Sequence, residues 1–320
     1  MYIKSFKSKP VFAAVLVSLI LAGCSASQDN TTSKNVATHS VTHELGITDV
    51  PDKVERVVTL ELGLTETTAA LGVIPIGVAD DDKPERIAAG TMELIEGYTS
   101  VGTRAQPNLE VIRSLNPDLI IADVDRHESI YEELEKIAPT VAFHDDAANY
   151  KTVIETTAKL GDTLNKESEA EELITQHNQL SEELKAKMAV TKKTVLQAGY
   201  GEDNVFSVST SSAFTPGFLT TLGVNYALQD ETATTQELTI EQLLKINPDT
   251  LIVTITEDAP SVIETLKEDP LWNKLTAVSN NQVYEVGHND WSRRRTLLAI
   301  EDNKEKLSEI IQNIKTENAE

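Results

Sequence analysis

The fold is decided by residues 101–127, which read VGTRAQPNLEVIRSLNPDLIIADVDRH. The apolar spacing predicts a short helix over 108–115, whose first residue, an asparagine, can accept a hydrogen bond from a first-turn N–H. A Pro-Asp turn then leads into a continuous apolar run at 119–122, which predicts a buried strand. Arg126 and His127 follow the carboxyl end of that strand, where open α/β sheets bind their ligands.

A second copy of this helix-turn-strand unit occurs at residues 238–253, LTIEQLLKINPDTLIV. Its Pro-Asp pair at 248–249 matches the pair at 117–118, and Leu-Gly-Val occurs at both 71–73 and 222–224. Two copies in the same order predict two similar lobes. The succession of strand, helix and strand predicts right-handed crossovers and parallel sheets. The predicted fold class is therefore α/β, with two Rossmann-like lobes.

The composition excludes some classes of partner. A chain of 320 residues with 40% hydrophobic residues can bury a large core and is long enough for two domains. The net charge of −23 makes nucleic acid a poor partner. Aromatic residues make up 5% of the chain, which argues against a pocket walled by many stacked rings.

The first 24 residues have the pattern of an export signal. Three lysines precede an apolar segment at 11–22, which is too short to span a membrane comfortably. The small residues before Cys24 resemble the lipobox of bacterial lipoproteins, in which the cysteine is acylated. We therefore expect a lipid anchor on the extracytoplasmic face of the cell membrane; the alternative is an ordinary secretion signal with a chance cysteine. Cys24 is the only cysteine, so the chain cannot form an intramolecular disulfide.

The predicted organisation has five parts. Residues 1–24 are the signal, 25–42 a polar flexible tether, 43–160 the N-terminal lobe, 161–190 a connecting helix and 191–320 the C-terminal lobe. The predicted strands are 43–48, 56–60, 74–78, 119–122, 140–143, 193–198, 205–207, 250–255 and 282–286. The predicted helices are 64–71, 108–115, 130–137, 168–188, 218–222, 240–246, 261–267 and 297–314.

Basic side chains gather near the predicted strand ends, although the chain as a whole is acidic. A guanidinium group presents a planar fork of donors that suits carboxylates and stays charged. Pairing with surface carboxylates would explain any one of these arginines, but a set from two lobes predicts a site for an anion. If residues 293–295 are extended, the first and third arginine share one face. Trp291 either lines the site or packs under the last helix. The predicted ligand-binding residues are Arg104, Arg126, His127, Tyr200, His288, Trp291, Arg293 and Arg295.

The sequence carries none of the enzyme signatures that we sought. It has no G-x-S-x-G, H-E-x-x-H, G-x-x-x-x-G-K or C-x-x-C motif. His127 and His144 lack the spacing of a dedicated metal site. We therefore expect no catalytic residues, no protein ligands to a metal and no intrinsic cofactor. A tethered enzyme acting on an anionic substrate stays open, and it would have to use Asp123, Asp125 and His127.

Several motifs together resemble one protein family. GTRAQPNLE at 102–110, NPDLIIAD at 116–123, INPDTLIV at 246–253 and WSRRR at 291–295 are similar to those of lipid-anchored substrate-binding proteins of ABC importers for ferric siderophores, in the ferric citrate and carboxylate-siderophore branch. The resemblance covers about residues 43–313. It implies class III periplasmic-binding-protein lobes joined by one long helix, with the ligand in the cleft between them.

The resemblance also implies roles for particular residues. Arg104, Arg126, Arg293 and Arg295 occupy the positions that contact the anionic complex, while the siderophore's own oxygens hold Fe(III). An ABC permease and its ATPase would be the protein partners, and the family docks the permease through one surface glutamate in each lobe. We expect Glu66 in the first lobe. The second lobe has no glutamate at the equivalent helix, and Glu202 or Glu231 could replace it.

Besides an anionic ferric siderophore and the tethered enzyme, two further alternatives stay open: another ligand and a protein partner. The same fold could carry a hydroxamate siderophore, haem or a corrinoid, although the scarcity of methionines and aromatic residues weakens the last two. The chain could also act mainly on a protein partner, as a sensor subunit does; loss of the cleft arginines would then leave its activity intact.

Overall fold

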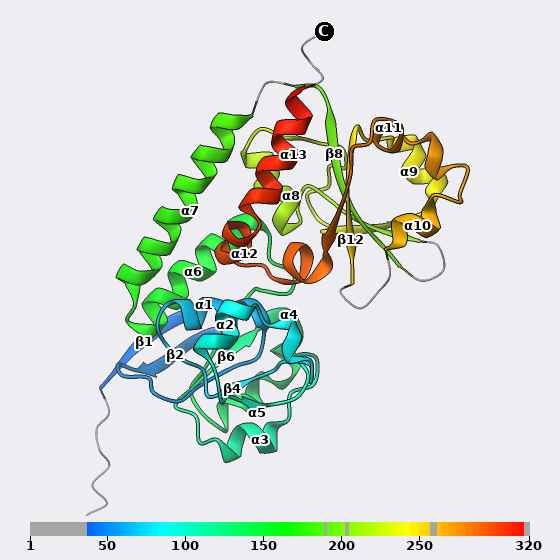
Figure 1. The fold of residues 1–320 in the computed structure, drawn as a ribbon. Coiled ribbons are helices and arrows are strands. Elements are labelled where there is room, and N and C mark those ends of the chain that lie inside the picture. The colour runs from blue at the N-terminus through cyan, green and yellow to red at the C-terminus, as the bar shows by residue number, and fades with distance from the viewer. Residues whose placement is uncertain (1–36, 189–190, 202–204, 257–260, 317–320) are drawn as a thin grey trace, which may run out of the picture. The chain divides into compact units, whose positions relative to one another are not determined.

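The computed structural model describes residues 37–188, 191–201, 205–256 and 261–316 (Figure 1). The predicted signal, Cys24 and most of the predicted tether lie outside these ranges. Among the described residues, no helix is both long and apolar enough to cross a membrane.

The described chain begins with an antiparallel hairpin. Strand β1 (Thr38–His43) pairs with β2 (Gly46–Pro51), and Val41 and Val50 are buried beneath it. The predicted tether end at 42 and the predicted strand at 43–48 are therefore wrong. The polar composition concealed β1, because a strand of a hairpin buries only alternate side chains and its other residues can be polar.

The N-terminal lobe is a parallel sheet with strand order β5-β4-β3-β6-β7. Its strands are β3 (Val57–Thr59), β4 (Gly77–Val78), β5 (Thr99–Ser100), β6 (Leu119–Asp123) and β7 (Thr140–Phe143). Its helices are α1 (Leu62–Ala70), η1 (Pro84–Arg86), α2 (Ala89–Leu94), α3 (Leu109–Ser114), α4 (Val124–His127), η2 (Glu128–Ile130) and α5 (Tyr131–Glu135). All residues of β3, β6 and β7 are buried, as expected for strands covered on both faces.

The C-terminal lobe has a mixed sheet with strand order β11-β9-β8-β12-β13, and β10 also pairs with β8. Its strands are β8 (Thr194–Tyr200), β9 (Phe206–Ser209), β10 (Asn225–Tyr226), β11 (Thr235–Leu238), β12 (Thr250–Ile255) and β13 (Val283–Gly287). Its helices are α8 (Phe214–Thr221), α9 (Ile240–Ile246), α10 (Val262–Leu266), η4 (Trp272–Lys274), α11 (Thr276–Ser279) and the π-helical turn η5 (Asn289–Arg293). Two helices, α12 (Leu297–Asp302) and α13 (Lys304–Thr316), replace the single terminal helix that the sequence predicted. The two-lobed α/β class is confirmed, but β9 and β11 are antiparallel, so the two lobes are not full copies.

The long helix α7 (Glu167–Lys187) joins the cores of the two lobes. It follows α6 (Tyr150–Leu164) and runs beside α6, α12 and α13 (Figure 1). Ala170, near its start, packs in the core of the N-terminal lobe, whereas Leu180 and Leu184 pack in that of the C-terminal lobe. One continuous helix is therefore shared by two hydrophobic cores.

The repeated Asn-Pro-Asp sequence performs the same local task in both lobes. Asn116, two residues after the end of α3, and Asn247, directly after α9, have φ of 45° and 48°, and each is followed by a proline. The next residue, Asp118, accepts hydrogen bonds from the backbone N–H groups of residues 55 and 56 at the start of β3. Asp249 likewise accepts from the backbone N–H of Thr194, at the start of β8. The repeat therefore ends a helix and ties the start of a neighbouring strand.

Candidate functional site

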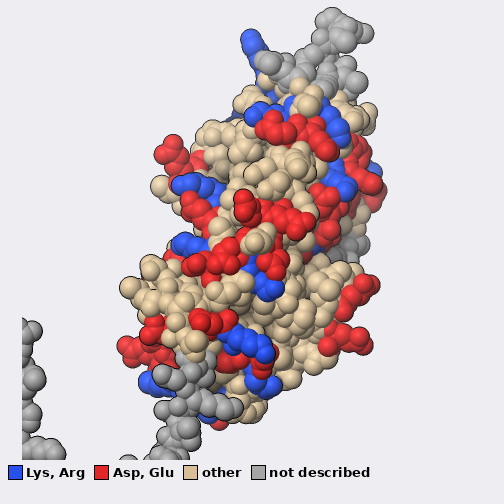
Figure 2. Space-filling view, turned by 90° about the vertical axis from the view of Figure 1, so that its left-hand side faces the viewer, with Lys and Arg blue, Asp and Glu red and all other residues tan. Residues whose placement is uncertain are grey.

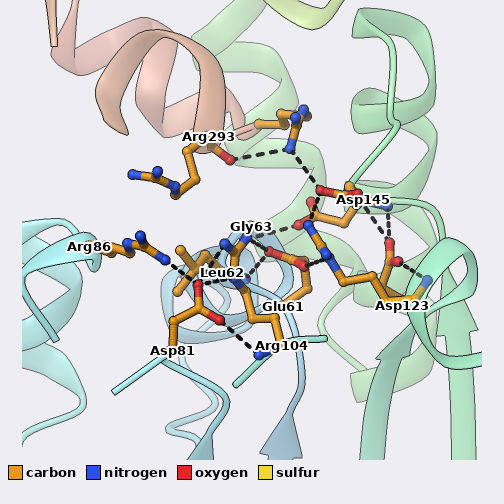
Figure 3. A network of polar contacts seen from close by, with 12 residues as sticks. Glu61, Leu62, Gly63, Asp81, Arg86, Arg104, Asp123, Asp145 and Arg293 are labelled. Carbon is orange, nitrogen blue, oxygen red and sulfur yellow. Dashed lines mark hydrogen bonds and ion pairs between the residues drawn. The ribbon is translucent and has the colours of Figure 1, made fainter. Parts of the chain in front are cut away.

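Charged residues from the carboxyl ends of the N-terminal strands meet at one edge of the lobe (Figure 3). Glu61 follows β3, Asp81 follows β4, Asp123 ends β6 and Asp145 follows β7. The carboxyl ends of parallel strands are where ligands bind in open α/β sheets. The arginines of this cluster are Arg86, Arg104 and Arg126 of the N-terminal lobe and Arg295 of the C-terminal lobe. Arg293 lies beside them (Figure 3).

Arg104 is held by two carboxylates. Its side chain is only 9% exposed; Nη1 donates to Glu61 Oε1 at 2.5 Å, and Nε donates to Asp81 Oδ2 at 2.9 Å. Burial works against its charge, but the neighbouring carboxylates outweigh that effect and raise the pKa of Arg104. For Asp81, burial by itself would raise the pKa of the carboxyl group. Hydrogen bonds from Arg104 and Arg86 outweigh burial and lower that pKa to about 2. Both groups are therefore charged at neutral pH.

Arg126 and Arg295 bring the two lobes to the same carboxylate. Arg126 Nε donates to Glu61 Oε2 at 2.9 Å, and its Nη2 donates to Asp146. Arg295, from the C-terminal lobe, places Nη1 3.8 Å from Asp146 Oδ1. Glu61 is fully buried, whereas Arg126 is 25% and Arg295 23% exposed. Arg126 and Arg295 are therefore more accessible to a ligand than Arg104.

His127 positions the site and does not reach a ligand. It is fully buried, its Nδ1 accepts from the backbone N–H of Asp123 at 3.0 Å, and its Nε2 lies 2.7 Å from the carbonyl oxygen of Arg104. Because Nδ1 accepts, Nε2 carries the proton and donates to that carbonyl. The predicted ligand contact of His127 is therefore wrong in this structure, because its ring lies under the loop of Arg104.

Asp145 is a buried acid beside the cluster. Its Oδ2 accepts from the backbone N–H of Gly63 at 3.2 Å, at the start of α1. Burial, and then the charge of Glu61, raise the pKa of Asp145 well above its usual range. A Cβ at position 63 would lie 2.3 Å from Asp145 Oδ1. Gly63 is therefore required for this close approach.

The three consecutive arginines point in different directions. Arg294 is buried and donates to Glu66 through Nε, at 3.1 Å, and through Nη2, with Asp290 and Asp302 beside it. Arg293 Nη1 donates to Asn289 Oδ1 at 3.0 Å, and Arg293 lies beside the cluster (Figure 3). Arg295 Nη1 lies 3.8 Å from Asp146 Oδ1. Arg293 ends the π-helical turn η5, so residues 293–295 are not extended throughout, and the ligand contacts of Arg293 and Arg295 stay predictions.

Glu66 is not a surface residue. It is 5% exposed on α1, accepts from Arg294 and accepts from the Thr296 hydroxyl at 3.1 Å. The predicted permease contact of Glu66 is therefore wrong, because the packing of α1 against the segment before α12 buries the carboxylate. Of the second-lobe substitutes, Glu231 is exposed and Glu202 lies outside the described residues.

A small hollow of about 60 Å³ adjoins the cluster on the side of the C-terminal lobe. Asp146 and Arg295 line it, together with the neutral side chains of Gln197, Ser209 and Ser292. Trp291 also borders the hollow, but it is 3% exposed and packs in the core of this lobe, so it combines the two roles that the sequence left open.

Two further predicted residues lie at the ends of C-terminal strands. Tyr200 ends β8 and packs its ring 5.0 Å from that of Phe206, whereas His288 follows β13; both are partly exposed. The ligand contacts of both residues stay predictions.

The sequence reasoning overlooked the carboxylates of the site. Glu61, Asp81 and Asp146 offset the positive charge that the arginines were expected to bring. Each follows the carboxyl end of a strand, so the rule that selected Arg126 could also have selected them. Asp and Glu side chains also spread over the face in Figure 2, with Lys and Arg between them.

Comparison with known proteins identifies the family to which the chain belongs. A family model described as "Periplasmic binding protein" matches residues 57–289. The chain is 38% identical over 304 residues to the putative ABC transporter substrate-binding lipoprotein YhfQ of Bacillus subtilis, covering 91% of this chain and 94% of that one. It is also 38% identical over 290 residues to the Fe(3+)-citrate-binding protein YfmC of the same organism, covering 90% and 91%. The crystal structure of Staphylococcus aureus SirA complexed with staphyloferrin B matches at 26% identity with a TM-score of 0.74, covering 86% of this chain and 98% of that one.

Proposed function

Because the chain belongs to the periplasmic binding protein family, we propose that it captures the Fe(III) complex of citrate or of a carboxylate siderophore and delivers it to an ABC importer. The observation that carries the proposal is the meeting of Arg126 and Arg295, from different lobes, at one partly exposed carboxylate, Asp146. The names of YhfQ, YfmC and the SirA complex support it.

The arginines would bind the anion by exchanging partners. The guanidinium groups already donate to carboxylates of the chain, and the hollow of about 60 Å³ is smaller than the roughly 300 Å³ that ligand pockets usually reach. Carboxylates of the incoming complex would replace Asp146 on Arg126 and Arg295, and the two lobes would part to admit it. Oxygens of the bound complex hold the iron, so the protein supplies charge and hydrogen bonds.

The same proposal includes the anchoring of the chain. Acylation of Cys24 would hold the protein on the extracytoplasmic face of the cell membrane, as the lipobox pattern predicts and as the lipoprotein name of YhfQ supports. More than one acyl chain gives a stable anchor, whereas a single chain gives only marginal binding.

The permease contact is better assigned to Glu110 and Glu241 than to Glu66. Glu110 lies in the first turn of α3 and Glu241 in the first turn of α9, at equivalent positions of the repeated unit. Both are exposed, in contrast to Glu66, and each belongs to a different lobe. A pair of acids related by the repeat suits a transporter with two equivalent basic contacts.

A titration of the intrinsic fluorescence of residues 25–320 with ferric citrate tests the ligand. Arg126→Ala removes a charged donor, so the Kd should rise about 10- to 100-fold, and Arg126→Lys should recover only part of the affinity because lysine lacks the planar fork. Arg113→Ala, an exposed arginine of α3, is the control and should leave the Kd unchanged. Equal binding by Arg126→Ala and the wild type would refute the anion site, and binding of ferric hydroxamates alone would change the ligand class.

Iron uptake by cells tests the permease contact. The double variant Glu110→Lys with Glu241→Lys should abolish uptake while the purified variant keeps its Kd for ferric citrate. The double variant Glu132→Lys with Glu264→Lys, which replaces exposed glutamates of α5 and α10, is the charge-matched control. Normal uptake by the 110/241 variant would refute the assignment.

A further inference from the structure

Gln197 is a buried amide inside the C-terminal lobe with an incomplete set of hydrogen bonds. It lies in β8, is 2% exposed and lines the hollow of about 60 Å³. Its Nε2 donates to Ser209 Oγ at 3.3 Å and to Ser292 Oγ at 3.1 Å. Its Oε1 is buried and has no hydrogen-bond partner among the residues that the structure describes.

One atom of the Gln197 amide lacks a partner. Both serine hydroxyls accept from Nε2, whereas no group of the described residues donates to Oε1. A buried polar group without a hydrogen bond destabilises the fold, and such groups are rare in folded proteins. The position therefore suits a partner from outside the chain.

The hollow favours an uncharged partner. Gln197, Ser209 and Ser292 carry no charge, and the charges of Asp146 and Arg295 at its border lie 3.8 Å apart and offset each other. A carboxylate placed here would face Asp146, whereas a group with both an N–H and a carbonyl oxygen can pair with an amide and a hydroxyl together. The volume accommodates a few non-hydrogen atoms.

We propose that Gln197, Ser209 and Ser292 form a subsite for a carboxamide group of the bound ligand, next to the arginines that bind its carboxylates. The inference rests on the proposed function and deepens it, because it favours iron complexes of citrate derivatives that carry an amide over the complex of citrate alone. Gln197 then determines specificity, while Arg126 and Arg295 supply most of the affinity.

Two matched probes test the subsite: ferric citrate and the Fe(III) complex of citrate monoamide, in which one carboxyl group is an amide. For the wild type, the binding free energy divided by the net charge of the complex should be larger for the amide complex than for ferric citrate. Gln197→Leu should raise the Kd for the amide complex about 3- to 10-fold, as for the loss of one net hydrogen bond. The Kd for ferric citrate should change less than twofold. Ser292→Ala should also raise the Kd for the amide complex, since Ser292 no longer orients the side-chain amide of Gln197.

The controls separate the possible failures. Gln176→Leu, an exposed glutamine of α7, should leave both affinities unchanged. Thermal unfolding shows whether Gln197→Leu is folded, and Ser292→Ala replaces it in the comparison if it is not. Equal effects on the two complexes, or none, overturn the subsite while the proposed function stands. A wild type that binds neither complex overturns the proposed function itself.

Discussion

Replacement of Glu66 by alanine should destabilise the protein strongly, because the Glu66 carboxylate is buried against Arg294. Arg294 Nε and Nη2 both donate to Glu66, and the Thr296 hydroxyl donates to Glu66 Oε2. The Arg294 side chain is 4% exposed and the Glu66 side chain 6% exposed. The alanine variant would leave the guanidinium buried without its most buried partner.

The magnitude follows from what remains around Arg294. Removal of one partner of a buried ion pair costs about 3–5 kcal/mol. Asp290 and Asp302 still contact Arg294, but their side chains are 52% and 56% exposed and screened by water. We therefore expect the lower end, about 3 kcal/mol of unfolding free energy, which corresponds to a fall in Tm of roughly 6–12 °C at about 2–4 °C per kcal/mol.

Urea unfolding followed by circular dichroism measures this effect. Glu110→Ala, which removes an exposed glutamate, should change the free energy of unfolding by less than about 0.5 kcal/mol. The double variant Glu66→Gln with Arg294→Met should recover much of the loss, because a neutral buried pair of similar volume is tolerated. A loss below about 1 kcal/mol in Glu66→Ala would refute the reasoning and would indicate that water reaches Glu66 in solution.

Two further predictions concern the neighbours of the arginine cluster. Gly63→Ala should lower the free energy of unfolding by about 1–3 kcal/mol, because its Cβ would meet Asp145. Gly90→Ala in α2, where the added Cβ meets nothing within 4 Å, should raise it by about 0.5–1 kcal/mol in the same denaturant assay, and equal effects at the two sites would contradict the contact. A carboxyl whose pKa is raised by folding contributes stability at low pH, and that contribution is lost as the pH rises through the raised pKa. Since the pKa of Asp145 is raised by its burial and by Glu61, the Tm of Asp145→Asn relative to the wild type should increase from pH 4 to pH 8; a constant difference would show that Asp145 does not resist ionisation.

The elements that the sequence predicted well are those set by local patterns. The helix at α3 and the strand at β6 follow from apolar spacing, and Gly72 and Gly223 end α1 and α8 with φ of 82° and 93°. These features depend on residues within a few positions of each other. The polar strand β1 could not be predicted in this way, because its pairing with β2 in the hairpin, and not its own composition, makes it a strand.

The sequence predicted where the site lies but only some of the residues that form it. The carboxyl ends of the strands indicated Arg104 and Arg126, because the position of a strand end can be found from sequence. The contact of Arg104 with Glu61 joins residues that are 43 positions apart, and no periodicity relates them. Burial likewise turned His127 from a supposed ligand contact into a support for the loop of Arg104.

The sequence by itself determined the two α/β lobes, the long helix between them and the strand ends at which arginines gather, since these depend on periodicity, helix caps and the order of elements. Only the tertiary structure decided which charges meet. It paired the cleft arginines with Glu61, Asp81 and Asp146, buried Glu66 against Arg294 and left Gln197 without a full set of hydrogen bonds. The reason is that hydrogen bonds and ion pairs act over a few ångströms between residues far apart in the chain, so they exist only once both lobes have folded.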